Sequence, residues 1–437
     1  MADEDGPRRL EIAVVGAGWA GLASAVEATR AGSHVTLYEM APAAGGRARD
    51  VIWHGRVLDN GSHICIGAYV ETLRLLQSVG VDAAATFDRR PLTLVDSDGR
   101  GLRMHAGAPL PAFARAVLRR RGWSWRERFA LLQIAARWRR AGFRCAEEAT
   151  VAGLTSTLPA AVRAEFIEPL CVAALNTPAR EASGSVFLRV LQAALAESAG
   201  GADLLLPRVP LGAVLPAPAL AWLERAGATI RLGHRVERLE RVADGWQVDG
   251  GRSDRVIVAA SAVEAARLLA PHAPAWAAQA SALRYEPIAT VYASSAGCVL
   301  PEPLVALHAD AGRPAQFVFD LGQLGREPGL LALVISGASA WVARGTPATE
   351  AATFAQASEQ LAGHLRGPLR LVGTVVEKRA TFACVPKLAR PPMAVAPGIV
   401  ACGDYVEGPF PATIEGAVRS GIAAARALAS RSGENPR

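Results

Sequence analysis

The chain has 437 residues, 51% of them hydrophobic and 20% charged, which is ordinary for a globular protein and long enough for two domains. Its net charge of +7 comes almost entirely from arginine, and since neither a nucleic-acid-binding motif nor Arg/aromatic alternation accompanies it, we expect no nucleic-acid partner. The six cysteines are scattered, without a CxxC pair or a histidine at metal-ligand spacing, which predicts buried thiols in a reducing compartment and no metal site.

The N-terminal region predicts a strand, a glycine turn, a helix and a second strand. The first ten residues, MADEDGPRRL, are acidic and contain no apolar segment, so we expect no secretory signal and a cytoplasmic protein. A β-branched run at 12–15 enters the sequence GAGWAG at 16–21, an alanine-rich stretch follows, and 34–39 is the second strand. This order is typical of the βαβ unit of a dinucleotide-binding fold.

The glycines of GAGWAG have separate roles in such a fold. Gly16 permits the tight turn, Gly18 lets the backbone approach a pyrophosphate, and Gly21 lets the helix pack closely against the strand. The helix N-terminus offers unpaired N–H groups to the same anion. Glu39 ends the second strand, where its carboxylate would accept ribose hydroxyls, which favours FAD or NAD over NADP. The alternative is a glycine turn that binds no ligand.

A second glycine turn follows at 43–49. Gly45 and Gly46 directly precede Arg47, whose guanidinium could reach a bound pyrophosphate. The alternative is that Arg47 and Arg49 are solvated surface charges.

The segment LDNGSHICIGAY, at 58–69, joins a polar turn to a small apolar stretch. Asn60 and its neighbouring aspartate close a turn through their own backbone, and Gly61 supplies conformational freedom. A chain that turns sharply and then becomes apolar predicts a lined pocket, with residues 64–69 as one wall.

Residues 111–148 and 154–197 have a helical pattern. The segment 113–144 mixes Trp, Phe and Leu with arginines at roughly helical spacing, which resembles an interfacial amphipathic helix on anionic lipid. The alternative is a pair of arginine-coated helices with solvated charges. Asn176, in the apolar segment LCVAALNTP, either caps a core helix or lines a substrate tunnel.

The rest of the chain predicts strands and a final helix. Residues 228–261 alternate and contain tight turns, as several short strands would. Two further strands and one helix are expected at 290–293, 330–336 and 350–365. Near the end, a strand and a glycine turn lead through a loop into a helix at 414–429.

Polar groups at this C-terminal turn could contact a flavin cofactor. Asp404, directly after Gly403, could bond sugar-chain hydroxyls. The helix N-terminus at Thr413 and Ile414 could stabilise negative charge on a reduced flavin ring. Thr413 alone could equally be a simple N-cap.

Together, GAGWAG…E…GGRAR, the DNG turn and GD…PATIEGA resemble the FAD-binding signature of the flavin amine-oxidase and carotenoid-desaturase superfamily. The resemblance implies an α/β fold with a Rossmann-like FAD domain of the glutathione-reductase type, built from separated segments, and an inserted α+β substrate domain. It places the FAD domain at 8–85, 208–283 and 395–432, and the substrate domain at 86–207 and 284–394. It also implies that the Val236 backbone holds the adenine and that 258–261 is a strand re-entering the FAD domain.

Longer segments, among them DNGSHICIGAYVETLRLL, LCVAALNTPAREASGSVFLRVLQ and EKRATFACVP, resemble the hydroxysqualene dehydroxylases of bacterial hopanoid biosynthesis. This resemblance implies non-covalently bound FAD, an isoprenoid substrate and reduction of hydroxysqualene to squalene. Ser62 departs from the pattern, which usually has a longer polar residue there. A carotenoid or phytoene desaturase is the alternative. A flavin amine oxidase is less favoured, since its usual lysine is missing from 287–292. A non-catalytic FAD- or lipid-binding protein is a further alternative of a different class.

The predicted catalytic residues are His63 and then Tyr69, each of which could instead be a structural hydrogen-bonding group. No second glycine-rich dinucleotide motif is evident, so an external flavin reductant is expected, and the long hydrocarbon substrate favours peripheral membrane contact through 113–144. The predicted FAD-binding residues are Gly16, Gly18, Gly21, Glu39, Gly45, Gly46, Arg47, Asn60, Gly61, Val236, Gly403, Asp404, Thr413 and Ile414.

Overall fold

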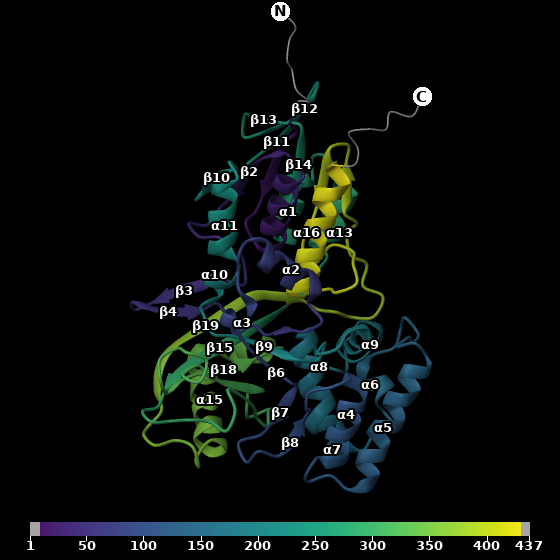
Figure 1. Ribbon diagram of the computed structural model, residues 1–437, viewed down its shortest axis with the longest axis vertical. Helices are drawn as coiled ribbons and strands as arrows, with labels where there is room; N and C mark the ends of the chain where they lie inside the picture. The colour runs from purple at the N-terminus through teal and green to yellow at the C-terminus, as the bar shows by residue number, and fades with distance from the viewer. Residues whose placement is uncertain (1–8, 430–437) are drawn as a thin grey trace, which may run out of the picture.

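The computed structural model describes residues 9–429, and Figure 1 shows their arrangement. A parallel sheet with its helices forms one end of the molecule, while a second sheet and a group of helices form the other. The prediction that the first ten residues contain no secretory signal falls mostly on residues outside the described range. Residues 8 and 430–432 of the predicted FAD domain also lie outside it.

The parallel sheet is assembled from three separated parts of the chain. Its strand order is β10-β2-β1-β14-β21-β20, and only β20 runs antiparallel to its neighbour. A three-stranded antiparallel sheet, β11-β12-β13, lies beside it. The strands are β1 (Glu11–Val15), β2 (His34–Glu39), β10 (Thr229–Leu232), β11 (Leu239–Val242), β12 (Gly245–Val248), β13 (Gly251–Ser253), β14 (Arg255–Val258), β20 (Ala394–Ala396) and β21 (Ile399–Ala401). This arrangement, with the parallel sheet drawn from distant segments, confirms the predicted fold class.

Helices from the two ends of the chain pack together on this sheet (Figure 1). A Cβ atom on Gly421 would lie 2.1 Å from the carbonyl oxygen of Ala20, so the two helices approach this closely only because Gly421 has no side chain. The buried Glu415 carboxylate accepts hydrogen bonds from the backbone N–H and the hydroxyl of Thr72, at 2.9 and 2.7 Å. These contacts fix the N-terminus of the last helix. The helices are α1 (Trp19–Arg30), α2 (Val70–Ser78) and α16 (Ile414–Ala429).

The second sheet is antiparallel, with the order β16-β17-β18-β15-β19. One face packs against α15 (Thr346–Gln360), and the opposite face is also apolar. Its longest strand, β19, crosses the middle of the molecule between the two ends (Figure 1). The strands are β15 (Tyr285–Ser294), β16 (Leu304–Ala306), β17 (Phe317–Asp320), β18 (Leu330–Ile335) and β19 (Arg370–Phe382).

The helical group contains the segment 113–144, which forms two helices joined by a short loop. Their apolar side chains, such as Phe113, Ile134 and Trp138, are buried in the protein core. Most of the apolar side chains of these helices therefore pack inside the molecule, while a few remain on its surface. The helices are α4 (Pro109–Arg119), α5 (Trp125–Arg140), α6 (Val151–Leu154), α7 (Ala160–Val162), α8 (Glu168–Leu175) and α9 (Gly184–Gln192), with π-helical turns at Arg163–Ile167 and Ala193–Glu197.

Within residues 9–429, no helix is both long and apolar enough to span a membrane.

Shorter elements connect these parts. The connecting elements are α3 (Ala83–Thr86), α10 (Leu211–Val214), α11 (Pro216–Arg225), α12 (Ala262–Leu269), α13 (Pro274–Ser281), α14 (Ser339–Arg344), β3 (Asp50–Trp53), β4 (Arg56–Asp59), β5 (Cys65–Ile66), β6 (Phe87–Arg90), β7 (Thr93–Val95), β8 (Gly101–Arg103) and β9 (Leu204–Pro207).

A strand is expected at 258–261, but the strand in this region, β14, spans Arg255–Val258 and ends where the predicted one begins. The chain must leave the sheet there to pass over the glycine turn. A Cβ atom on Gly16 would lie 2.8 Å from the carbonyl oxygen of Ala259, so the two loops are in direct contact. Residues 259–261 line the site described next and do not extend the strand.

Candidate active site

One cavity of about 470 Å³ extends from the glycine turn to the apolar face of the second sheet. All but one of the residues predicted to bind FAD or act in catalysis line it. The exception is Gly21, which lies behind the turn. The predicted residues that line the cavity are Gly16, Gly18, Glu39, Gly45, Gly46, Arg47, Asn60, Gly61, His63, Tyr69, Val236, Gly403, Asp404, Thr413 and Ile414.

Glycines leave a groove of bare backbone at one end of the cavity. Gly16 has φ +107°, a backbone conformation that side chains rarely allow, and Gly18 forms a bridge with Gly45. A Cβ atom on Gly21 would lie only 1.8 Å from the carbonyl oxygen of Gly16, so Gly21 permits close packing, as predicted. Helix α1 follows without a side-chain cap and without an acidic residue in its first turn, which leaves its N–H groups available to an anion.

The Glu39 carboxylate lies at the end of β2, beside this groove. It accepts hydrogen bonds from the backbone N–H groups of Ala17, at 2.7 Å, and Ala41, at 2.9 Å. These bonds fix the carboxylate at the cavity wall. Further along the wall, the Val236 carbonyl accepts a 2.6 Å bond from Arg267, so the backbone at Val236 is also held in place.

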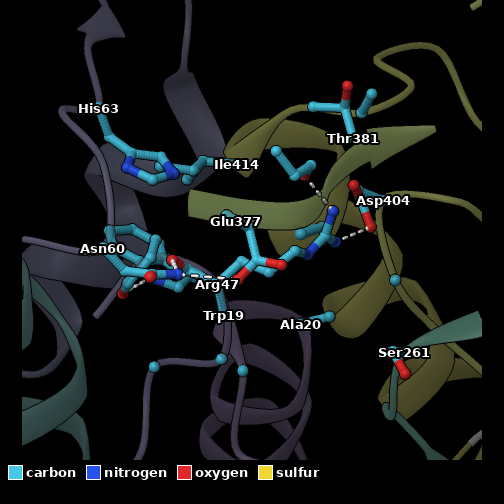
Figure 2. Close-up of a pocket in the computed structure, with 18 of the residues that line it drawn as sticks. Trp19, Ala20, Arg47, Asn60, His63, Ser261, Glu377, Thr381, Asp404 and Ile414 are labelled. Carbon is cyan, nitrogen blue, oxygen red and sulfur yellow. Dashed lines mark hydrogen bonds and ion pairs between the residues drawn. The ribbon is translucent and has the colours of Figure 1, made fainter. Parts of the chain in front are cut away.

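The Arg47 guanidinium crosses the cavity, as Figure 2 shows. It donates to the Asp404 carboxylate at 2.5 Å and to the carbonyl of Ala380 in β19 at 2.7 Å. Burial lowers the pKa of Arg47, but the charge of Asp404 and its hydrogen bond outweigh burial and raise it above the ordinary value. Arg47 is therefore not a solvated surface charge. It connects the glycine turns, the C-terminal turn and the second sheet.

In the polar turn of LDNGSHICIGAY, some residues stabilise the loop and others line the cavity. Asp59 accepts the backbone N–H of Leu211 at 2.9 Å and pairs with Arg326 at 3.3 Å, so its role is to hold the loop. Asn60 faces the cavity and donates to the carbonyl of Arg47 at 3.1 Å (Figure 2). Ser62, the residue that departs from the family pattern, also lines the cavity and is hydrogen-bonded to the Tyr292 phenol.

The imidazole of His63 is held as one tautomer. Its Nδ1 lies 2.8 Å from the carbonyl oxygen of Gly61, which can only accept, so Nδ1 carries a proton and Nε2 is left as an acceptor in the neutral ring. Burial lowers the pKa of His63, the bond to Gly61 opposes this, and the charge of Arg47 lowers the pKa further. The net shift is downward, so the neutral form predominates at pH 7.

The apolar stretch at 64–69 reaches the cavity only at its ends. Ile64 and Tyr69 line the cavity, whereas Cys65–Ile66 form β5 and pair with β9, which turns the middle of the stretch away. The predicted wall is therefore wrong for residues 65–68. Burial raises the pKa of Tyr69, which keeps its phenol protonated, and its hydroxyl contacts that of Thr413.

Thr413 caps α16, because its hydroxyl accepts the backbone N–H of Gly416 at 3.0 Å. It also lines the cavity, so the two interpretations of this residue are compatible. Cys402 is fully buried outside the cavity lining, and burial raises the pKa of its thiol to about 12. This thiol is protonated and is not positioned to attach a cofactor.

Asn176 combines the two roles that its sequence leaves open, a helix end and a cavity wall, whereas Glu377 and most of the apolar lining could not be identified from the sequence. Asn176 both ends α8, with φ +46°, and lines the cavity, and its amide donates to the Glu286 carbonyl at 3.1 Å and to Thr381 at 3.0 Å. Through these hydrogen bonds, Asn176 connects the C-terminal end of α8 to strands β15 and β19 of the second sheet. Glu377, in β19, accepts a 3.0 Å hydrogen bond from Asn60. The apolar lining comes mainly from Ile64, Val172, Leu175, Ile288, Phe317, Phe319 and Val334.

Comparison with known proteins accounts for this arrangement. Residues 19–429 match the model of a protein family described as flavin containing amine oxidoreductase. The chain belongs to this flavin-containing amine oxidoreductase family. Hydroxysqualene dehydroxylases from Sinorhizobium fredii and Rhodopseudomonas palustris are each 27% identical to it, across 95% of this chain and 97% of either relative.

Two further matches concern a related group of enzymes and the fold of the chain. A zeta-carotene desaturase from Zea mays is 34% identical over only 24% of this chain and 19% of its own length. The solved structure of an oxidoreductase from Methanosarcina mazei superposes with a TM-score of 0.71 over 94% of this chain and 99% of its own, at 15% identity. The latter shows that the two chains share a fold over nearly their whole length.

The family makes this chain an FAD-dependent oxidoreductase. The cavity fits that cofactor, because a bare glycine groove and an uncapped helix N-terminus suit a pyrophosphate and a fixed carboxylate suits a ribose. Among residues 9–429, no cluster of three or more His, Cys, Asp or Glu could hold a metal ion.

Proposed function

We propose that the chain reduces hydroxysqualene to squalene by removing the hydroxyl group. The main support is its full-length similarity to two hydroxysqualene dehydroxylases. The cavity supports the same function, since its flavin-binding end continues into a chamber walled by Phe317, Phe319 and Val334, which suits a hydrocarbon chain.

We propose that the predicted residues bind FAD along the cavity. The glycine groove and Glu39 would hold the pyrophosphate and ribose, and Asp404 would bind the sugar chain in exchange for part of its contact with Arg47. Bound FAD, once reduced, supplies a hydride. Because no second glycine-rich dinucleotide motif is evident in the sequence, we propose that an external reductant delivers the electrons.

The reaction breaks a C–O bond, forms a C–H bond and releases water, so the leaving hydroxyl needs a proton. We propose His63 as the donor, with Tyr69 as the second candidate. His63 can donate from Nε2 only when protonated, since its neutral ring presents an acceptor there. Tyr69 keeps its proton at all physiological pH values, because burial raises its pKa. The apolar walls exclude water, which strengthens electrostatic interactions inside the chamber.

The product distinguishes this function from its alternatives. Anaerobic incubation of the reduced protein with hydroxysqualene should yield squalene, and chromatography would detect it. New conjugated double bonds in a supplied polyene would instead indicate a desaturase, which the partial match to a zeta-carotene desaturase favours as the second candidate. Peroxide release from simple amines would indicate an amine oxidase.

We propose that the chain works in the cytoplasm at the inner face of the membrane, where a long hydrocarbon is most readily collected. Although most apolar residues of 113–144 are buried, three of them remain on the surface: Leu118 is 36% exposed, Trp125 61% and Phe129 51%. Arg119, Arg121 and Arg126 are exposed beside them in the sequence. Aromatic side chains among arginines suit the interface of an anionic bilayer.

The purified protein should sediment with anionic liposomes, and high salt should weaken this binding because it screens the arginine charges. Replacing both Trp125 and Phe129 with alanine should reduce the sedimented fraction at least about threefold, since this removes the exposed apolar area. Neutral liposomes are the control. Equal amounts of protein in the supernatant with and without anionic liposomes would contradict membrane contact.

A further inference from the structure

The apolar chamber carries one carboxylate at its flavin-facing edge. Glu377 lies directly opposite Ile288 in the pairing of β19 with β15, and directly opposed residues point to the same face of a sheet. Both side chains line the cavity. Glu377 therefore lies beside the chamber wall and, through its bond to Asn60, beside the turn that carries His63 (Figure 2).

The Glu377 carboxylate has no ion-pair partner among the described residues, although the Arg47 guanidinium lies close enough for the two charges to interact. Its two carboxylate oxygens accept from the Asn60 amide at 3.0 Å and from the backbone N–H of Arg379 at 3.0 Å, and it forms no ion pair with any of residues 9–429. Of the other three carboxylates that line the cavity, two form ion pairs and the third lies at the glycine turn. Asp404 and Glu264 pair with arginines, and Glu39 accepts two backbone N–H groups beside the glycine turn.

We propose that the Glu377 carboxylate stabilises the positive charge that develops on the substrate carbon as its C–O bond breaks. The inference rests on the proposed function, in which the hydroxyl leaves with the bonding electrons, takes up a proton and departs as water. Bound reduced FAD would supply the hydride that completes the new C–H bond. A negative charge fixed beside an apolar chamber favours the cationic transition state, because water screens its field less there than in bulk solvent.

A Glu377→Gln variant tests the role of this charge. The amide keeps the size of the side chain and an oxygen that can accept from Asn60. We expect unchanged FAD content and KM, and kcat for squalene formation lowered about 100-fold, the size of effect seen when one electrostatic partner of a transition state is lost. Glu350→Gln is the matched control, since Glu350 bonds Thr374 of the same strand but does not line the cavity.

Binding of a charged analogue gives a second readout that does not depend on turnover. An isoprenoid tertiary amine, protonated at neutral pH, mimics the cationic carbon, and the ether of the same shape is its neutral counterpart. Wild-type protein should bind the amine at least about tenfold more tightly than the ether, a difference of about 1.4 kcal/mol. Glu377→Gln should lose this preference while binding the ether equally well.

These outcomes separate the inference from the proposed function. If wild-type protein makes squalene and Glu377→Gln matches its kcat, or if the variant keeps the preference for the amine, the role of Glu377 is wrong and the function stands. If wild-type protein makes no squalene, the function is wrong.

Discussion

Replacing Gly21 with alanine should cost the protein its FAD. The added Cβ atom would lie 1.8 Å from the carbonyl oxygen of Gly16 and 3.2 Å from the Cβ of Ala259. Because the nearest atom is backbone, the glycine turn or α1 must move by more than an ångström. We expect the free energy of unfolding to fall by about 1–3 kcal/mol and the Kd for FAD to rise at least about tenfold.

Thermal unfolding followed with and without added FAD measures both effects, and the flavin absorbance of the purified protein gives the bound fraction. Gly363→Ala is the control, because a Cβ atom there would meet nothing within 4 Å. A Gly21→Ala protein with normal flavin content and an unchanged melting temperature would show that this turn does not hold the cofactor.

Replacing His63 with alanine should lower kcat by about 10²–10⁴, the range that proton transfer by a positioned side chain contributes. If His63 is the donor, kcat should also depend on pH in a defined direction. Since burial and then Arg47 lower the pKa of His63, against the opposing bond to Gly61, the protonated donor is populated only below the ordinary value of 6.5. We expect kcat of the wild type to rise as the pH falls through this lowered pKa and to decrease as the pH rises.

The pH-dependent limb should be absent in His63→Ala. His364→Gln is a suitable control, because its ring also bonds a backbone carbonyl, that of Ser97, but does not line the cavity. A His63→Ala enzyme with normal FAD content and unchanged kcat would assign His63 a structural role and leave Tyr69 as the donor.

Much of this architecture could be predicted from the sequence because local chemistry specifies it. The second strand of the βαβ unit and the last helix have the bounds predicted for them, 34–39 and 414–429, since glycine turns and a helix cap delimit them. The glycine turns, Glu39 and Asp404 follow recognisable elements, so their convergence on one cavity could also be predicted.

The remaining features depend on contacts that sequence spacing does not encode. Glu377 lies in a long strand whose side chains alternate between faces, and only its pairing with Ile288 indicates which face points into the cavity. The tryptophan-rich helices of 113–144 have an apolar pattern that suits either a membrane or a protein core, and only tertiary packing shows which of their apolar side chains are buried. Likewise, pairing with β9 turns 65–66 away from the cavity.

The domain boundaries stay a prediction. The strands of the parallel sheet come from 11–39, 229–258 and 394–401, and those of the second sheet from 285–382. Limited proteolysis of the protein with bound FAD would locate the exposed connections between the two parts.

The proposed function requires that reduced flavin in this cavity transfer a hydride to hydroxysqualene. The most direct measurement is to photoreduce the FAD-bound protein without oxygen, add hydroxysqualene and follow the flavin absorbance while quantifying squalene. We predict reoxidation of the flavin with one squalene formed per flavin. Flavin that stays reduced in the presence of hydroxysqualene, or reoxidises without squalene, would contradict the proposed function.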